Sequence, residues 1–248
     1  MFSKKKLLPR IIFCLFIALT LFTRFIKLNW GDGYFFHPDE NNMATAISRL
    51  SFSDLNPHFF AYGQFPLYLC FFSLKLFLRI DTINFSQAIF ALRFYSALFS
   101  SLSVFIFYQI GRILFYQKKS AKIFTLLLVL SPGLIQLAHF GTTESFLIFI
   151  FALNLYISFK LLRSPKIFLL IFLSALITGL GLASKITSVI FTAPIYLAIF
   201  FRFFLSKKYK KFFLYSFIFS LILILYSMLF SPYSLIAWSD FISTINYE

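Results

Sequence analysis

Charged residues are scarce in this sequence of 248 residues, where Asp, Glu, Lys and Arg together make up only 12%. A soluble domain needs about 25% charged residues to cover its surface. Hydrophobic residues make up 60% of the chain, and the mean hydropathy is +0.87. The shortage of charge excludes a soluble globular protein and predicts an integral membrane protein.

Cysteine is also rare, because only Cys14 and Cys70 are present and both lie in apolar segments. Two such residues predict neither a disulfide framework nor a metal cluster. The sequence shows no internal repeat, no low-complexity linker and no soluble domain. No small-x-small cleavage motif follows the first apolar run, so residues 1–30 are predicted to be an uncleaved signal anchor.

Acidic residues are fewer still, with 8 Asp and Glu against 23 Lys and Arg and a net charge of +15. Such a basic balance is compatible with nucleic-acid binding. The basic residues, however, lie in short clusters between apolar runs, which is typical of cytoplasmic loops facing anionic lipid. The pattern therefore favours membrane lipid as a partner and argues against nucleic acid.

Long apolar runs are the main feature that is present, and each approaches the roughly 20 residues that a membrane-spanning helix needs. They are too long and too uniformly apolar for strands, which predicts an all-α polytopic membrane protein. The eight runs are Leu8–Leu28, Phe59–Leu78, Phe94–Phe115, Ile123–Phe140, Phe146–Leu162, Ile167–Ala183, Ile186–Phe204 and Phe212–Phe230.

The distribution of charge predicts the topology. If Phe59–Leu78 does not cross the membrane, all basic clusters fall on the cytoplasmic side and all eight carboxylates fall outside. We therefore expect seven crossings, a cytoplasmic N-terminus and a large external loop over residues 29–92. The run Phe59–Leu78 then lies at the outer interface or re-enters. The basic clusters are Lys4–Lys6 with Arg10, Arg112 with Lys118, Lys119 and Lys122, Lys160 with Arg163 and Lys166, and Arg202 with Lys207, Lys208, Lys210 and Lys211.

The densest group of ionisable and turn-forming residues is GDGYFFHPDENN, residues 31–42. Its adjacent carboxylates, Asp39 and Glu40, are suited to a general base or to cation binding. The simpler alternative is a solvated loop in which Asp39 caps a helix over Asn41–Leu50. Because the pair lies among aromatic residues near the membrane surface, we expect partial desolvation to raise its basicity. Asp39 is thus the first candidate for a catalytic residue.

Five further residues are candidates on the same outer side. Glu144 lies in HFGTTES, residues 139–145, and either serves as a second acidic group or only complements a helix dipole. Arg93 and Lys185 are expected at the outer ends of their helices, where they either hold a lipid phosphate or extend to the interface. His139, together with His37, is a possible metal ligand, although the spacing matches no zinc signature and interfacial histidines are common.

Five stretches in this order resemble the GT-C glycosyltransferases related to dolichyl-phosphate-mannose–protein mannosyltransferases (PMT) and to the bacterial lipid A aminoarabinose transferase. They are HPDENNMATAISRL, YGQFPLYLCFFSL, ALRFYSALFSSLSVFIFYQIGRILF, LSPGLIQLAHFGTTESFLIF and the weaker GLASKITSVI. The first resembles the family's Pro-Asp-Glu loop and the helix after it. The second resembles its external juxtamembrane segment and adds Tyr62 and Gln64 as site candidates.

The resemblance implies that residues 1–248 form one GT-C-type transmembrane domain that is truncated at its C-terminus, in a bacterial or archaeal plasma membrane. It implies inverting transfer of a sugar from a polyprenyl-phosphate carrier to a protein, lipid or glycan acceptor on the outer face. Asp39 would be the base and Glu40 its support, Glu144 the second acid, and Arg93 and Lys185 the phosphate-side residues. The family usually has Asp where Glu144 stands, and often Glu or His near Gln64, so a divalent metal cofactor stays open.

Three other interpretations remain. A flippase for lipid-linked sugars, or another transporter, would place ionisable groups at mid-membrane, whereas the carboxylates here gather outside. A ligase or polymerase of surface glycans would share the carrier lipid and lack the Pro-Asp-Glu loop. A non-functional fragment would misfold or be degraded when expressed alone.

Overall fold

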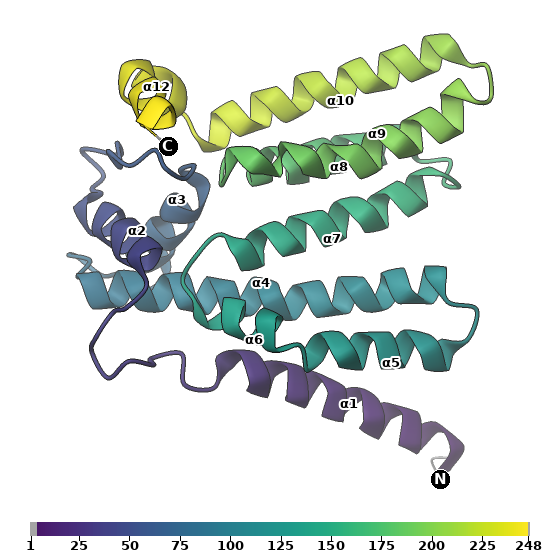
Figure 1. Ribbon diagram of the computed structural model, residues 1–248, viewed down its shortest axis with the longest axis horizontal. Coiled ribbons are helices and arrows are strands. Elements are labelled where there is room, and N and C mark those ends of the chain that lie inside the picture. Colours follow the sequence, from purple (N-terminus) through teal and green to yellow (C-terminus); the bar gives the residue numbers. More distant parts are fainter. Residues whose placement is uncertain (1–3, 248) are drawn as a thin grey trace.

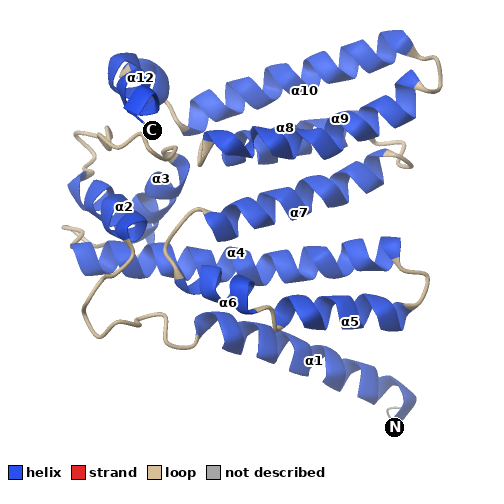
Figure 2. Ribbon diagram, in the orientation of Figure 1, coloured by secondary structure: helices blue, strands red, loops and turns tan. Residues whose placement is uncertain are grey.

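The computed structural model describes residues 4–247, and every regular element within that range is a helix (Figure 2). This confirms the expected all-α class. Residues 1–3 and Glu248 lie outside the described residues, as do the side chains of residues 4–10, Ile12, Ile245 and Tyr247. The predicted placements of the first basic cluster and of the Glu248 carboxylate therefore stay predictions.

The elements follow one another along the chain with short connections, apart from the segments before α2 and α3. They are α1 Lys4–Phe25, α2 Pro38–Arg49, α3 Phe65–Phe72, η1 Ser73–Phe77, α4 Phe85–Leu114, α5 Lys118–Val129, α6 Pro132–His139, α7 Glu144–Leu161, α8 Ile167–Leu182, η2 Ile186–Thr192, α9 Ala193–Ile199, η3 Phe200–Phe204, α10 Tyr209–Phe230, α11 Tyr233–Ile236 and α12 Trp238–Tyr247.

The longest helix, α4, is the centre of one half of the molecule and packs against α1, α2, α5, α6 and α7 (Figure 1). The other half is formed by α7, α8, α9 and α10, whose buried side chains make a second apolar cluster. A separate cluster joins α2, α3 and the start of α4. The two short helices α2 and α3 are thereby fixed to the end of α4.

Among the described residues, four helices are long and apolar enough to cross a membrane: α4, α7, the composite Ile186–Phe204, and α10. The pair α5 and α6 makes a fifth if it is one bent span. The apolar stretches Phe13–Phe25, Phe65–Phe77 and Ile167–Leu182 are shorter. The structure thus agrees with a polytopic protein, and the count of seven crossings stays a prediction.

Charge is segregated along the long axis of the molecule. The connections α4–α5, α7–α8 and α9–α10, which carry the basic clusters, lie at the same end as the N-terminus (Figure 1). The short helices α2, α3 and α12, with the segments that hold the carboxylates, lie at the opposite end. We call this second end the carboxylate end.

Two of the expected continuous helices are interrupted. The run Ile123–Phe140 divides into α5 and α6, which meet at an angle of 49°, because Pro132 cannot donate a backbone N–H to the Leu128 carbonyl. The Arg24 side chain, which is fully buried, donates to that carbonyl at 2.9 Å and also to Val129. The run Ile186–Phe204 divides into a 3₁₀ segment, the α-helix α9 and a π segment.

Candidate active site

The Pro-Asp-Glu loop forms the start of α2. Pro38 occupies the first turn, where its missing N–H costs nothing, and His37 is the N-cap residue with an extended backbone. The helix therefore starts three residues before the expected Asn41, and Asp39 is not its cap. Asp39 and Glu40 both lie in the first turn, where the helix dipole favours negative charge.

Glu40 turns into the protein and pairs with Arg93 of α4. The Nε and Nη2 atoms of Arg93 donate to the two carboxylate oxygens of Glu40 at 3.0 and 2.8 Å, and both side chains are fully buried. The backbone N–H of Gly141 also donates to Glu40 Oε1. Glu40 is therefore saturated with donors, which makes it a structural anchor for α2.

Arg93 uses its remaining nitrogen to hold the segment after α1. Its Nη1 atom donates to the carbonyls of Leu28 and Trp30, both at 3.0 Å, and its guanidinium lies 4.3 Å from the Trp30 ring centre. Since α4 begins at Phe85 behind a capping box of Asn84 and Gln87, Arg93 lies two turns inside the helix and not at its end. Contrary to the expected place at the helix end, four of its five N–H groups donate to Glu40, Leu28 and Trp30 within the protein.

Asp39 differs from Glu40 in both exposure and partners. It is half-buried, and within the part of the chain that the structure describes its carboxylate has no hydrogen bond or ion pair. The preceding His37 packs on Phe140 with ring centres 4.8 Å apart, and its buried Nδ1 atom has no partner. One rigid helix turn thus presents a free carboxylate beside a neutralised one.

Glu144 and Lys185 form a second ion pair at the carboxylate end. Lys185 Nζ lies 3.1 Å from Glu144 Oε1, and the two side chains are 30% and 34% exposed. Lys185 Nζ also lies 4.9 Å from the centre of the Tyr62 ring. The structure therefore brings together three residues that were predicted separately, and it leaves them accessible.

The backbone around Lys185 is held by the segment that precedes α3. The N–H groups of Gly63 and Phe65 donate to the carbonyls of Ser184 and Ala183, both at 2.9 Å. A Cβ at Gly63 would overlap the Ala183 carbonyl oxygen. This close approach fixes the start of η2, whereas the long Lys185 side chain beyond it is free to change rotamer.

Changing Gly63 to alanine should therefore displace the loop that carries Lys185. Overpacking of this kind costs about 1–3 kcal/mol, and we expect lower thermal stability in detergent together with loss of any activity that needs Lys185. Gly133 is the matched control, because a Cβ there meets no atom within 4 Å. Equal stability of Gly63→Ala and Gly133→Ala would contradict this role for the contact.

Gln64 connects the start of α3 to the segment after α10. It is fully buried, and its Oε1 atom accepts from the Tyr233 N–H at 2.9 Å and from the Tyr68 hydroxyl at 3.3 Å. Burial raises the pKa of Tyr68 well above its usual value, and Tyr233 and Asp54 add to the effect, so the hydroxyl stays a donor. The Gln64 Nε2 atom is buried without a partner. Gln64 is an internal connector in this arrangement.

His139 ends α6 and contacts the segment after α1. Its ring nitrogens lie 2.7 Å from the Ile135 carbonyl and 2.8 Å from the Ile26 carbonyl, and its own carbonyl accepts from Trp30 Nε1 at 2.9 Å. Both nitrogens are thus occupied by backbone groups. Across the described residues, no three His, Cys, Asp or Glu side chains converge as a metal site would require.

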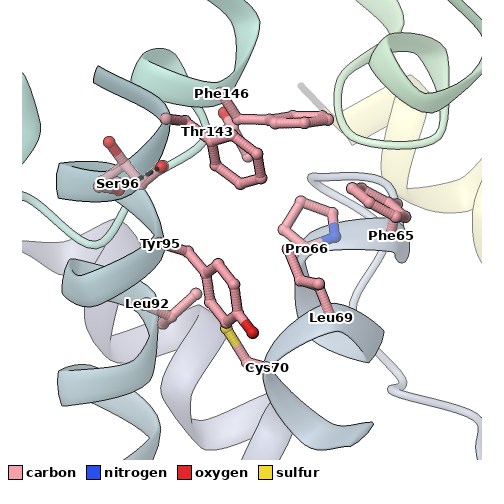
Figure 3. A pocket seen from close by; sticks show the side chains of 11 residues that line it. Phe65, Pro66, Leu69, Cys70, Leu92, Tyr95, Ser96, Thr143 and Phe146 are labelled. Atoms are coloured by element: carbon pink, nitrogen blue, oxygen red, sulfur yellow. Dashed lines mark hydrogen bonds between the residues drawn. The ribbon is translucent and has the colours of Figure 1, made fainter. Parts of the chain in front are cut away.

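Three hollows lie near these residues. The smallest, about 20 Å³ between α3, α4 and α7, is lined by Pro66, Tyr95 and Thr143 among others (Figure 3); it has room for one water and not for a sugar. A groove of about 260 Å³ has Tyr62, Leu182, Ile186 and Trp238 in its wall. An apolar groove of about 430 Å³ separates α3 and η1 from the end of α10.

Several residues that organise this region were not predicted. Gly141 supplies an N–H to Glu40, Trp30 stacks on Arg93, and Ser231 and Tyr233 contact Gln64. None of them carries a charge or a motif that marks it in the sequence. Arg24 does carry such a signal, because a cation at the end of an apolar run needs an internal partner.

Comparison with known proteins gives one family and one fold. The family model described as dolichyl-phosphate-mannose-protein mannosyltransferase matches residues 68–236. The chain is similar to the structure of the S. cerevisiae protein O-mannosyltransferase Pmt1-Pmt2 complex bound to the sugar donor, with a TM-score of 0.67 and 17% identity over 97% of this chain. The match covers 35% of that yeast chain, so this chain spans about a third of its length. No curated protein matches the sequence.

Proposed function

Because the chain belongs to the dolichyl-phosphate-mannose-protein mannosyltransferase family, we propose that it transfers a sugar from a polyprenyl-phosphate carrier to an acceptor at the outer membrane face. The observation that carries this proposal is the unpaired, half-buried carboxylate of Asp39 next to the Glu40–Arg93 pair. A general base needs an accessible oxygen that is not already held by a buried cation. Of the two adjacent carboxylates, only Asp39 meets that condition.

In the proposed reaction Asp39 accepts the proton of an acceptor hydroxyl. The hydroxyl oxygen then attacks the anomeric carbon from the side opposite the carrier, so the new C–O bond forms with inversion. The bond between the anomeric carbon and the phosphate oxygen breaks, and its electrons leave on the carrier phosphate. Glu40 and Arg93 act as positioning residues, since their pair fixes the first turn of α2 against α4 and Gly141.

Lys185 is the proposed contact for the carrier phosphate. It is the accessible cation of the Glu144–Lys185 pair, and it borders the groove of about 260 Å³ through Tyr62. A cation at this position stabilises the charge that develops on the leaving phosphate. Burial of the prenyl chain in the apolar groove beside α3 and α10 would hold the carrier at the carboxylate end, so that proximity contributes to the rate.

The proposed location of the site follows from the separation of charge. The basic connections at one end of the molecule are typical of a cytoplasmic side, which supports an external position for the carboxylate end. Within this proposal the protein resides in a bacterial or archaeal plasma membrane and its acceptor is a protein, lipid or glycan. A divalent metal has no evident site among the described carboxylates and histidines.

A transfer assay in sealed membranes tests the function. Membranes containing the chain would receive a radiolabelled polyprenyl-phosphate sugar, and label in an acceptor peptide, lipid or glycan would be measured with the acceptor on one side only. We expect transfer to acceptor outside, and the opposite anomeric configuration in the product. Label that moves only from a sugar nucleotide, or only to acceptor inside, would contradict the proposal.

A transporter of lipid-linked sugars is the alternative that one observation favours. The span Ile186–Phe204 is irregular, and the buried atoms Asn154 Oδ1 and Ser188 Oγ beside it have no partner. Transporters use such interrupted helices near mid-membrane. The same membranes distinguish the two functions, because a transporter would move the labelled lipid between leaflets without forming a labelled product.

A further inference from the structure

If Lys185 binds phosphate, that role conflicts with its ion pair with Glu144. The carboxylate of Glu144 lies 3.1 Å from Lys185 Nζ. An incoming phosphate needs the same ammonium group and carries the same sign of charge as Glu144. Both cannot be the close partner of Lys185 without repulsion.

The surroundings of Glu144 allow it to give up Lys185. It is the first residue of α7, where the helix dipole stabilises a carboxylate, and its carboxylate also interacts with the side chain of Thr142 and with its own backbone N–H. Glu144 therefore keeps favourable partners after Lys185 leaves. This contrasts with the fully buried Glu40–Arg93 pair, where separation would leave a charge without solvent or partner.

Lys185 is equally able to change partner. Its backbone is fixed by the contact of residues 183–184 with Gly63 and Phe65, so only the flexible side chain has to move. The Tyr62 ring beneath its ammonium group supplies a cation–π contact that does not neutralise the charge. The side chain is about a third exposed, so an anion from outside can reach it.

We propose that Glu144 is a built-in counter-ion that competes with the carrier phosphate for Lys185 and is displaced when the prenyl phosphate binds. This inference rests on the proposed function for the identity of the anion. Displacement makes phosphate binding weaker than Lys185 alone would allow, which favours release of the spent carrier phosphate after transfer. The Glu144 carboxylate lacks its cation only while the carrier is bound.

Equilibrium binding of farnesyl phosphate to the purified chain in neutral detergent tests the competition without requiring transfer. An accessible ion pair contributes about 0.2–1 kcal/mol, so Glu144→Gln should lower the Kd by up to about fivefold. Lys185→Met should raise the Kd about tenfold or more, as expected for loss of a charged hydrogen bond. An unchanged or higher Kd for Glu144→Gln would overturn the proposal.

The double variant distinguishes exchange of Lys185 between Glu144 and the phosphate from simple repulsion between Glu144 and the phosphate. If Glu144 acts through Lys185, most of the gain from Glu144→Gln should disappear in the Lys185→Met background. An equal gain in both backgrounds would show that Glu144 only repels the phosphate, and would overturn the exchange. Asp32→Asn is the matched control, because Asp32 is an exposed carboxylate at the same end with φ 47°, a conformation that Asn also tolerates. It should leave the Kd unchanged.

A further variant and further ligands extend the binding test. Glu144→Asp keeps the charge at the helix start and withdraws it from Lys185, so it should show a smaller gain even if Glu144→Gln fails to fold. Inorganic phosphate should respond to the variants in the same direction with weaker binding. A stronger response to phosphatidic acid than to farnesyl phosphate would assign the site to bulk lipid and overturn the carrier assignment. Failure of the transfer assay with this binding pattern intact would refute the function and leave the exchange standing.

Discussion

Replacing Arg93 by methionine should cost about 3–5 kcal/mol of stability, because it leaves the fully buried Glu40 carboxylate without its cation. It also removes the donors to the Leu28 and Trp30 carbonyls, so the segment after α1 loses its attachment to α4. The measurement is thermal unfolding of the purified chain in detergent. Arg49→Met is the control, since Arg49 is exposed in the last turn of α2.

A double-variant cycle identifies the cause of the loss. Glu40→Gln alone should also destabilise, because the Arg93 guanidinium keeps its charge in a buried site. The double variant Glu40→Gln with Arg93→Met should be destabilised by less than the sum of the two single changes. Additive losses would show that the two side chains act independently, and stability of Arg93→Met equal to that of Arg49→Met would refute the anchoring role.

Replacing Asp39 by asparagine should lower sugar transfer by about 10²–10⁴-fold, the range for loss of a general base. Stability should change little, because the Asp39 carboxylate has no partner among the described residues and loses only about 0.3–1 kcal/mol of interaction with the helix dipole. The measurement is the radiolabel transfer assay, run alongside thermal unfolding of the same preparation.

Binding measurements distinguish loss of the general base from loss of carrier binding. Asp39→Asn should bind farnesyl phosphate as the unchanged chain does, because the proposed phosphate contact is Lys185 and not Asp39. Asp39→Glu should recover part of the transfer, since it restores a proton acceptor that is one methylene longer. Transfer by Asp39→Asn at the level of the unchanged chain would remove Asp39 as the base and leave the half-buried Glu144 as the next carboxylate to test.

The sequence by itself determined the class of the protein. Long apolar runs with few charges predict helices, since a bilayer leaves no other way to satisfy the backbone of most segments. The separation of the basic clusters from the carboxylates was visible in the order of residues, and the structure places the described basic connections and the described carboxylates at opposite ends. The Pro-Asp-Glu loop could also be identified as a candidate site, because its concentration of polar groups has no role in an apolar helix bundle.

Only the tertiary structure decided which carboxylate is free. Asp39 and Glu40 are neighbours, but one residue turns a helix by about 100°, so the side chain that faces α4 depends on where α2 begins. The start at Pro38 points Glu40 inward to Arg93, 53 residues away in sequence. Local sequence patterns indicate which residues are buried and the period of a helix. They carry no information about an ion pair between residues that lie so far apart in the sequence.

The pairing of Glu144 with Lys185 could not be predicted from the sequence for the same reason. Glu144 and Lys185 were each recognisable as polar residues at helix ends, yet they lie 41 residues apart and meet only because α7 and α8 pack side by side. The Gly63 contact that fixes the Lys185 loop is likewise a close approach between distant segments. Sequence determined which groups were available at the carboxylate end, and packing of the helices determined which of them neutralise each other.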